Sequence, residues 1–442
     1  MRNPKIPAKL FIENRERLKR LMLPNSLAVV NSNDVLPTNA DGTFLLHQNS
    51  DLRYLTGVRQ EESMLLLYPD AQDEKFREIL FLREPSEQLA TWEGPKLTRE
   101  QAQAQTGIRR VEWLGQFQAI LHRLICECDH VYLNTNEHKR AAVEVETRDA
   151  RFVQETLHRY PLHDYHRLAR LMHRLRAVKS EPEVVLLREA CTLTRKGFER
   201  VLRRLRPGMS ETEVEADFAY EFIKGGGAFA YPPIIASGES ACVLHYVKND
   251  AVCRSGELLL LDVASSYAGY NADMTRTIPV NGRFTRRQKA VYQAVLKMVR
   301  QASRLLRPGL LPSDWQKAVE SMAQEACLEL GLITRADVKR QSSDQPAFKK
   351  YFMHGAGHPL GLDVHDVGIT TEPIQAGWVM TVEPALYLKE EGFGVRLEED
   401  ILITETGQVN LMGDIPIEAE EIESWMAKGN RRGARRQRSR RR

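Results

Sequence analysis

The chain has 442 residues, of which 42% are hydrophobic, 28% are charged and 7% are aromatic. A chain of this length is expected to form about two or three domains, and its composition excludes a disordered or fibrous protein. No apolar run approaches the roughly 18–20 residues of a membrane span, so we expect no contact with a membrane.

The cysteines and the N-terminus indicate a reducing compartment. Six cysteines are scattered along the chain, too few and too irregularly spaced for a disulfide framework. The first 22 residues lack the apolar stretch and the small-residue cleavage site of a signal peptide. We therefore expect a cytoplasmic protein.

The N-terminal part of the chain is predicted to form an α/β domain over residues 1–174. Leu18, Leu21 and Met22 have helical spacing. A polar helix is predicted over residues 163–176, and Ser180 is predicted to cap the helix that follows it. Short apolar runs bounded by turn residues predict four strands, at residues 27–30, 64–68, 79–82 and 131–134.

An internal repeat organises the C-terminal part, residues 175–428. The segments "FERVLRRLRPGMSETEVEADF" (198–218) and "VRQASRLLRPGLLPSDWQKAV" (299–319) share a basic amphipathic helix, an Arg-Pro-Gly turn and a second helix. After each copy comes a pair of predicted strands that begins with glycine, at Gly256 and at Gly377. Two copies of this unit predict a duplicated α/β domain with pseudo-twofold symmetry.

The first repeated hairpin holds two aspartates between apolar strands. If it closes symmetrically at residues 267–268, Asp262 lies directly opposite Asp273. Directly opposed residues have Cβ atoms about 4.5–5.5 Å apart, a distance at which like charges destabilise a sheet. A cation between the two carboxylates would remove this repulsion.

The second hairpin repeats the arrangement with glutamates. A turn centred on residues 390–391 places Glu383 opposite Glu398. The strands around both pairs are apolar, so four carboxylates are expected in core strands, where an unpaired charge is costly. Carboxylate oxygens at this density suit divalent metal ions, and we predict two ions that share ligands.

Histidines between the two hairpins are candidates to complete this site. The segment "HGAGHPLGLDVHD" contains His354, His358 and His365. His354 and His358 have the i, i+4 spacing of a helical zinc motif. The glycines and the proline disfavour a helix there, and the glutamate of that motif is absent. We expect an extended or looping segment that delivers a histidine ligand to the carboxylates. His245, at the end of a predicted strand, is a further candidate.

The chain ends in a strongly basic segment, residues 429–442. Eight of the last twelve residues are arginines. Their eight positive charges exceed the net charge of +4, so the rest of the chain is net negative. Such a run buries no apolar area and is predicted to be disordered. A solvated tail is the simpler interpretation, and contact with nucleic acid or acidic lipid is the alternative.

Asp262, Asp273, His358, Glu383 and Glu398 together resemble the five-ligand dimetal site of the pita-bread (creatinase/aminopeptidase) metallopeptidases of family M24. This family includes methionine aminopeptidase, prolidase and aminopeptidase P. The motifs "NADMTRT", "TVEPALY" and "VRLEEDILIT", with the histidine segment, carry the resemblance. It implies an α/β (α+β) protein in which an N-terminal α/β domain precedes a duplicated pita-bread catalytic domain.

The N-terminal part carries a second resemblance. The segment "HQNSDLRYLTG" (47–57) is similar to the N-terminal domain of aminopeptidase P, which removes the residue that precedes proline at the N-terminus of a peptide. Methionine aminopeptidase usually lacks such a domain. The resemblance therefore implies an Xaa-Pro aminopeptidase whose partner is a peptide with proline in second position.

The resemblance also implies roles for the ligands. Asp273 and Glu398 would bridge two divalent ions, usually manganese in this branch of the family. Asp262 would complete the coordination of one ion, and His358 with Glu383 that of the other. A water shared by the ions would be the nucleophile, and Glu383 would shuttle its proton.

Four further residues take roles from the family pattern. His245 and His365 are similar to the residues that hold the scissile carbonyl and stabilise the tetrahedral intermediate. His354 would line the same pocket. Arg396 resembles the arginine beside the last metal ligand.

Departures from the family pattern concern substrate preference. Val263 and Ala264 stand where many relatives have Ala-Gly, and Pro359 replaces a bulky aromatic residue. The hairpin between the two glutamates is shorter than in many aminopeptidase P sequences. Prolidase action on Xaa-Pro dipeptides therefore stays an alternative. A binding module that has lost catalysis is a third hypothesis, and the presence of all five ligands disfavours it. Relatives commonly pair through the N-terminal domain, so we expect a homo-oligomer, a dimer or a tetramer.

Overall fold

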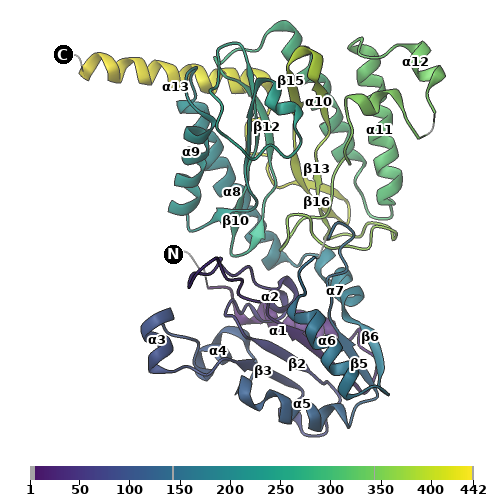
Figure 1. Cartoon of the computed structure of the whole chain (residues 1–442). Coiled ribbons are helices and arrows are strands. Elements are labelled where there is room, and N and C mark those ends of the chain that lie inside the picture. The colour runs from purple at the N-terminus through teal and green to yellow at the C-terminus, as the bar shows by residue number, and fades with distance from the viewer. Residues whose placement is uncertain (1–4, 142–143, 343, 441–442) are drawn as a thin grey trace. The chain divides into compact units, whose positions relative to one another are not determined.

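The chain divides into two compact units, Lys5–Arg176 and the part from Ala177 onward (Figure 1). Short apolar runs form the central strands of the first unit. The computed structural model describes residues 5–141, 144–342 and 344–440.

The first unit contains a six-stranded sheet with the order β4-β3-β2-β1-β5-β6. The pairs β1–β2 and β2–β3 are antiparallel, and the other three pairs are parallel. All four strands predicted from the sequence are present. The strands are β1 (Ser26–Asn31), β2 (Met64–Leu67), β3 (Glu78–Leu82), β4 (Arg110–Trp113), β5 (His130–Leu133) and β6 (Asp164–Arg167).

Helices connect and flank these strands. Phe81 on β3 packs edge-to-face against Phe117, with ring centroids 5.1 Å apart, in the buried core that the sheet shares with the helices. The helices are α1 (Ala8–Lys19), α2 (Ser50–Thr56), α3 (Glu87–Glu93), α4 (Arg99–Thr106), α5 (Phe117–Ile125), α6 (Arg148–Arg159) and α7 (Leu168–Ala177).

One predicted element of this unit differs from the structure. The helix expected over residues 163–176 begins only at Leu168, because residues Asp164–Arg167 form β6 beside β5. An edge strand that is partly exposed on both faces needs no apolar run, so its sequence carried no strand signal.

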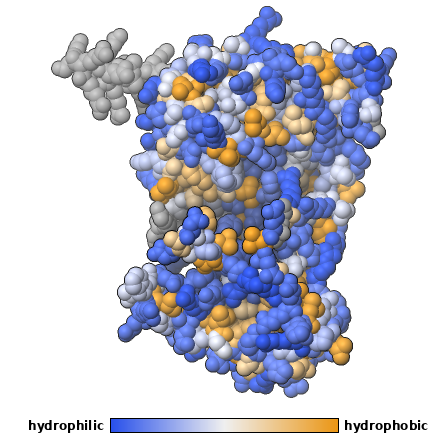
Figure 2. Space-filling model, viewed as in Figure 1, coloured by the Kyte–Doolittle hydropathy of each residue, from blue (hydrophilic) through white to orange (hydrophobic). Residues whose placement is uncertain are grey.

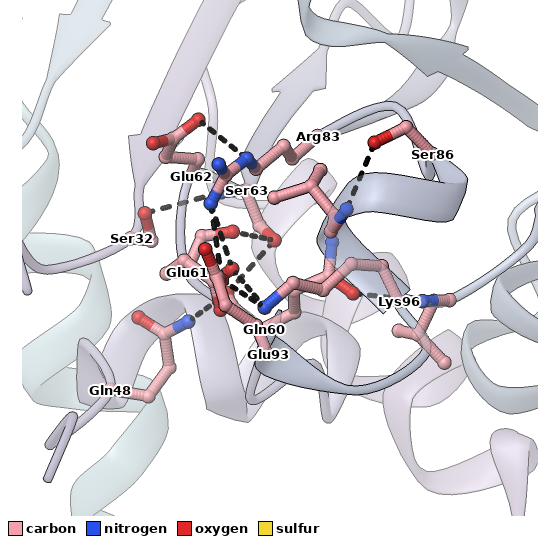
Figure 3. A network of polar contacts seen from close by, with 12 residues as sticks. Ser32, Gln48, Gln60, Glu61, Glu62, Ser63, Arg83, Ser86, Glu93 and Lys96 are labelled. Atoms are coloured by element: carbon pink, nitrogen blue, oxygen red, sulfur yellow. Dashed lines mark hydrogen bonds and ion pairs between the residues drawn. The ribbon is translucent and has the colours of Figure 1, made fainter. Parts of the chain in front are cut away.

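A network of charged side chains joins the loop before β2, the end of β3 and the region of α3 (Figure 3). The Lys96 ammonium lies 2.6 Å from a Glu61 carboxylate oxygen and 2.8 Å from one of Glu93. Arg83 lies 3.6 Å and 3.4 Å from the same two carboxylates. Burial alone would lower the pKa of Lys96, but its hydrogen bonds with Glu61 and Glu93 raise it, so the ammonium stays charged in this network.

Asp149 on α6 is a buried acid that makes the first unit sensitive to pH. Its carboxylate accepts hydrogen bonds from the side-chain amides of Asn31 (2.7 Å) and Asn49 (3.4 Å). Burial nevertheless raises the pKa of Asp149 from 3.8 to about 7. The folded protein therefore binds this proton more tightly than the unfolded chain, and stability falls as the pH rises from the unfolded pKa through the folded one.

We predict that Asp149→Asn removes this pH dependence. The pKa difference corresponds to at most about 4 kcal/mol, so the wild type should lose stability relative to the variant between about pH 4 and pH 8. Chemical denaturation at several pH values measures the difference, with the exposed Asp41→Asn as matched control. Parallel pH profiles for wild type and Asp149→Asn would contradict the prediction.

The second unit is built from the two predicted repeats. Figure 1 shows α8 and α9 on one side of the strands and α10 with α11 on the other. The Ser180 backbone amide donates to the Glu183 carboxylate at 2.8 Å where α8 begins, which confirms the predicted cap. The helices are α8 (Glu181–Arg204), α9 (Glu211–Lys224), α10 (Arg286–Leu305), α11 (Pro312–Glu329), α12 (Arg335–Arg340) and α13 (Ala419–Arg440).

The Arg-Pro-Gly turns have equivalent conformations in both repeats, which supports the predicted duplication. Gly208 and Gly309 have φ angles of 92° and 86°, a left-handed conformation that favours glycine. The amide of Gly208 donates to the Cys253 carbonyl, and that of Gly309 donates to the Ile374 carbonyl, each over 2.9 Å. Each turn is thereby bonded to the chain just before its repeat's hairpin.

The strands of the second unit form four small sheets, with the orders β12-β9-β8, β13-β16-β17, β11-β10-β7 and β14-β15. Strands β9 and β13 are buried along nearly their whole length. The strands are β7 (Ala228–Phe229), β8 (Ile234–Ser237), β9 (Leu258–Asp262), β10 (Ser265–Tyr267), β11 (Tyr270–Asn271), β12 (Thr275–Pro279), β13 (Val379–Val382), β14 (Ala385–Leu388), β15 (Phe393–Arg396), β16 (Glu399–Thr404) and β17 (Gly407–Asn410).

The basic C-terminal segment is predicted to be disordered, but the structure forms a helix there as far as Arg440. Helix α13 spans Ala419–Arg440, so it runs into the segment expected to be disordered. Arginine, alanine and glutamine are good helix formers, so the composition of this segment suits a helix. Residues 441–442 lie outside the described residues.

All six cysteines, each within the described residues, are free thiols. None of the helices in the described ranges is long and apolar enough to cross a membrane. On the face shown in Figure 2, hydrophobic residues form small patches among hydrophilic ones.

Candidate metal centre

The first hairpin presents two aspartates on one face of the sheet. Asp262 at the end of β9 lies opposite Thr275 on β12, not opposite Asp273 as predicted. The turn falls at Ala268 and Gly269, with φ angles of 53° and 89°, one position later than expected. The shift moves the register by two residues, so Asp273 stays on the same face as a diagonal neighbour of Asp262.

The second hairpin has the predicted register. Val382 pairs with Glu399, and Ala385 pairs with Arg396, so the register on both sides places Glu383 opposite Glu398. The two hairpins are therefore equivalent in outline. Each carries one carboxylate at the end of its first strand and one on the returning chain.

The histidine segment delivers His358 to these carboxylates in an extended conformation, as predicted. The His358 amide donates to Thr381 Oγ1 (3.0 Å), and the Thr381 amide donates to the His358 carbonyl (2.9 Å). Gly357 permits this approach, because a Cβ atom at that position would lie 2.1 Å from the Thr381 carbonyl oxygen. His358 Nδ1 lies 3.0 Å from the Pro359 carbonyl, which leaves Nε2 to face the carboxylates.

The five predicted ligands converge in a largely buried cluster. His358 Nε2 lies 3.4 Å from Asp273 Oδ2 and 3.8 Å from Glu383 Oε1. One ligand atom each from Asp273, His358 and Glu398 lie within 4.8 Å of one another. Asp262 interacts electrostatically with Asp273 and Glu398. Four carboxylates thus share one site with a single imidazole.

The electrostatics of this cluster fit divalent cations. Burial raises the pKa of Glu383 to about 7, and burial with the neighbouring carboxylates raises the pKa values of Asp262 and Glu398. Asp262 Oδ1 is buried and has no hydrogen-bond partner among the described residues. A cation would compensate both the crowded negative charge and this unpaired oxygen. A donor set of carboxylates and one imidazole suits Mn²⁺ or a similar ion.

Arg396 on β15 holds the other oxygen of Asp262. Its Nη2 donates to Asp262 Oδ2 at 2.5 Å, and its Nε donates to Thr275 Oγ1 at 3.1 Å. Thr275 in turn donates to Glu398 Oε2 at 2.7 Å. Arg396 therefore binds Asp262 directly and reaches Glu398 through Thr275, so its guanidinium connects carboxylates of both hairpins.

A chain of hydrogen bonds continues from Arg396 to His354. Arg396 Nη1 donates to the Tyr387 hydroxyl (2.6 Å), and His354 Nε2 lies 2.9 Å from that hydroxyl. His354 Nδ1 lies 3.8 Å from Glu383 Oε2. His354 is thus beside the cluster, as expected.

The remaining two histidines differ from each other. His365 is exposed, and its ring centroid lies 4.3 Å from that of His358, which puts it at the mouth of the cluster. His245 is also exposed, but it lies in a turn after a 3-10 helix and not at the end of a strand. Within the described ranges, the structure records no contact between His245 and the carboxylates.

Three residues of the site were not identified from the sequence. Thr275 and Tyr387 bind Arg396, and the Tyr231 hydroxyl is buried beside Asp262 and Asp273. The signal for Thr275 was the register of the first hairpin, which places it opposite Asp262. Tyr231 comes from a loop with no periodic pattern, so nothing in the sequence pointed to it.

Two family models match this chain. The model described as "Metallopeptidase family M24" matches residues 185–405, which include all five converging residues. The model described as "Aminopeptidase P, N-terminal domain" matches residues 11–132. Together they cover both units.

Curated relatives match over nearly the whole chain. "Xaa-Pro aminopeptidase" of Escherichia coli (strain K12) is 33% identical over 435 residues, which cover 94% of this chain and 97% of the relative. "Xaa-Pro aminopeptidase 3" of Homo sapiens is 31% identical over 411 residues, 89% of this chain and 80% of the relative.

Solved structures of aminopeptidases P are also similar to this chain over nearly its whole length. A putative aminopeptidase P from Bacillus anthracis has a TM-score of 0.88 and 31% identity, over 96% of this chain and 99% of that one. The aminopeptidase PepP of Pseudomonas aeruginosa has a TM-score of 0.85 and 32% identity, with the same coverage.

Proposed function

The chain belongs to metallopeptidase family M24, and from this we propose that it is a metal-dependent aminopeptidase that hydrolyses the bond between an N-terminal residue and a following proline. Its relatives over both units are named for this activity. The observation that carries the proposal is the convergence of Asp273, His358 and Glu398, with Asp262 and Glu383 beside them, in one buried cluster. A module that binds without catalysis has no need to keep all five.

We propose that these five residues hold two divalent ions, with Mn²⁺ the preferred metal. Asp273 and Glu398, whose ligand atoms lie within 4.8 Å of each other, would serve both ions, whereas Asp262 would bind one ion and His358 with Glu383 the other. When bound, the ions would lower the pKa of a coordinated water and polarise the substrate carbonyl.

The proton transfers are assigned to residues of the chain itself. Glu383 Oε1 would take a proton from the attacking water and deliver it to the proline nitrogen as that nitrogen leaves. The His354 imidazole lies beside the same carboxylate, with its Nδ1 3.8 Å from Glu383 Oε2. Exposed His365 would donate a hydrogen bond to the scissile carbonyl, which develops negative charge.

We propose the sequence-based domain bounds as functional bounds: residues 1–174 for the N-terminal aminopeptidase P-type domain and residues 175–428 for the catalytic domain. The substrate is a peptide with proline in second position, and the protein acts as a homo-oligomer in the cytoplasm. Six free thiols support a reducing compartment. His245, exposed in the turn after Cys242, would hold the scissile carbonyl together with His365.

The test compares three substrates of the Mn²⁺-loaded protein: a tripeptide with proline in second position, the same tripeptide with alanine there, and an Xaa-Pro dipeptide. We expect cleavage of the proline tripeptide with a kcat/KM at least about 100-fold above that of the alanine tripeptide. Mass spectrometry of the products locates the bond.

The other outcomes separate the alternatives. Cleavage of the dipeptide alone would assign prolidase activity, which the short hairpin between Glu383 and Glu398 leaves open. No cleavage of any substrate by protein with two bound ions would favour the binding module.

A further inference from the structure

A second cluster of metal-ligating side chains lies in the first unit, apart from the site described above. His130 is on β5, and Asp164 and His166 are on the edge strand β6. The two strands are parallel neighbours (Figure 1), with His130 in register with Asp164 and Tyr132 in register with His166. The pairing brings three ligands from two strands to one place.

The three ligand atoms face one another. His130 Nδ1 lies 2.8 Å from Asp164 Oδ2, His166 Nε2 lies 2.9 Å from the same oxygen, and the two nitrogens are 3.3 Å apart. The circle through these atoms has a radius of about 1.7 Å, shorter than the metal–ligand bonds of about 2.0–2.2 Å that imidazole and carboxylate form with Zn²⁺. One point therefore lies at bonding distance from all three atoms without any movement of the backbone.

The surroundings favour ligation. The His130 and His166 rings meet edge-on at 5.1 Å, and the Tyr132 ring packs 5.2 Å from that of His166, which fixes the orientation of the imidazole. Both histidines are half-buried and Asp164 is exposed, so water can fill the remaining coordination positions.

We propose that His130, Asp164 and His166 form a binding site for one transition-metal ion of the Zn²⁺, Ni²⁺ and Cu²⁺ class. Two imidazoles and one carboxylate suit these ions, whereas the carboxylate-rich cluster of the second unit suits Mn²⁺. A bound ion links the edge strand β6 to β5, so it stabilises the end of the sheet that has no further strand to pair with.

The test adds one equivalent of Cu²⁺ to the full chain loaded with Mg²⁺, which is diamagnetic and prefers the carboxylate-rich cluster, and records the electron paramagnetic resonance of the copper. We expect a signal with coupling to two imidazole nitrogens, which is lost in His130→Gln and in His166→Gln. His158→Gln, an exposed histidine of α6, is the matched control and should keep the signal. His365→Gln should also keep it, which excludes copper bound beside His358.

A second readout does not depend on copper. Zn²⁺ should raise the midpoint of thermal unfolding of the wild type by a few degrees, as expected for a ligand that binds only the folded state, and this rise should be absent in His166→Gln. Far-UV circular dichroism and unchanged peptidase activity verify that both variants fold. A two-nitrogen signal or a Zn²⁺ shift that survives in both His130→Gln and His166→Gln would overturn the proposal, as would the absence of both in the wild type.

Discussion

Replacing Asp273 by asparagine is expected to abolish metal binding and to lower kcat/KM for a proline-containing tripeptide by at least about 10³-fold, or about 4 kcal/mol of transition-state stabilisation. The ligand atoms of Asp273, His358 and Glu398 lie within 4.8 Å of one another, so Asp273 supplies one of the three closest ligands of the cluster. An amide of the same shape removes the charge that two cations would share.

The experiment measures bound metal by elemental analysis and turnover in the same preparations. Asp414→Asn, at an exposed carboxylate of the same unit, is the matched control and should change neither quantity. Metal content and rate that stay at the wild-type level in Asp273→Asn would contradict the assignment of Asp273 as a shared ligand.

Replacing Arg396 by glutamine is expected to destabilise the metal-free protein by about 3–5 kcal/mol, the cost of leaving a buried charge without its partner. The side chains of Arg396 and Asp262 are only 6% and 15% exposed, and their hydrogen bond is 2.5 Å long. Thr275 and Tyr387 lose a donor at the same time. Added Mn²⁺ should recover part of the loss, because a cation then compensates Asp262.

An exposed ion pair provides the comparison for Arg396. Arg287 binds Glu391 at 2.7 Å, but the two side chains are 39% and 35% exposed, so Arg287→Gln should cost no more than about 1 kcal/mol. Denaturant unfolding with and without Mn²⁺ measures both variants. Equal losses for Arg396→Gln and Arg287→Gln would show that Arg396 does not hold the cluster together.

The contrast between the two hairpins explains how much of the site the sequence predicts. Both register predictions assumed a symmetric turn, and the one for Glu383 and Glu398 was right. The other failed because the turn with two positive φ angles requires Gly269 at its second position. The error moved the register by two residues, an even number, so the aspartates stayed on one face and the inferred cluster survived.

Other features depend on tertiary contacts that have no local signal. The extended conformation of the His358 segment was predictable, because glycine and proline disfavour a helix there. The buried Tyr231 hydroxyl was not, since Tyr231 lies in an irregular loop. Strand β6 lacks an apolar pattern because an edge strand needs none, so the sequence predicts a helix over its residues, which include Asp164 and His166.

The most direct test of the account is the hydrolysis of a tripeptide with proline in second position by metal-stripped protein, before and after addition of Mn²⁺. We predict no cleavage without metal, and removal of the N-terminal residue alone once Mn²⁺ is added. Full cleavage by protein shown to hold no metal would contradict the assignment of the cluster as a metal centre. Metal binding without any cleavage would contradict the proposed peptidase activity.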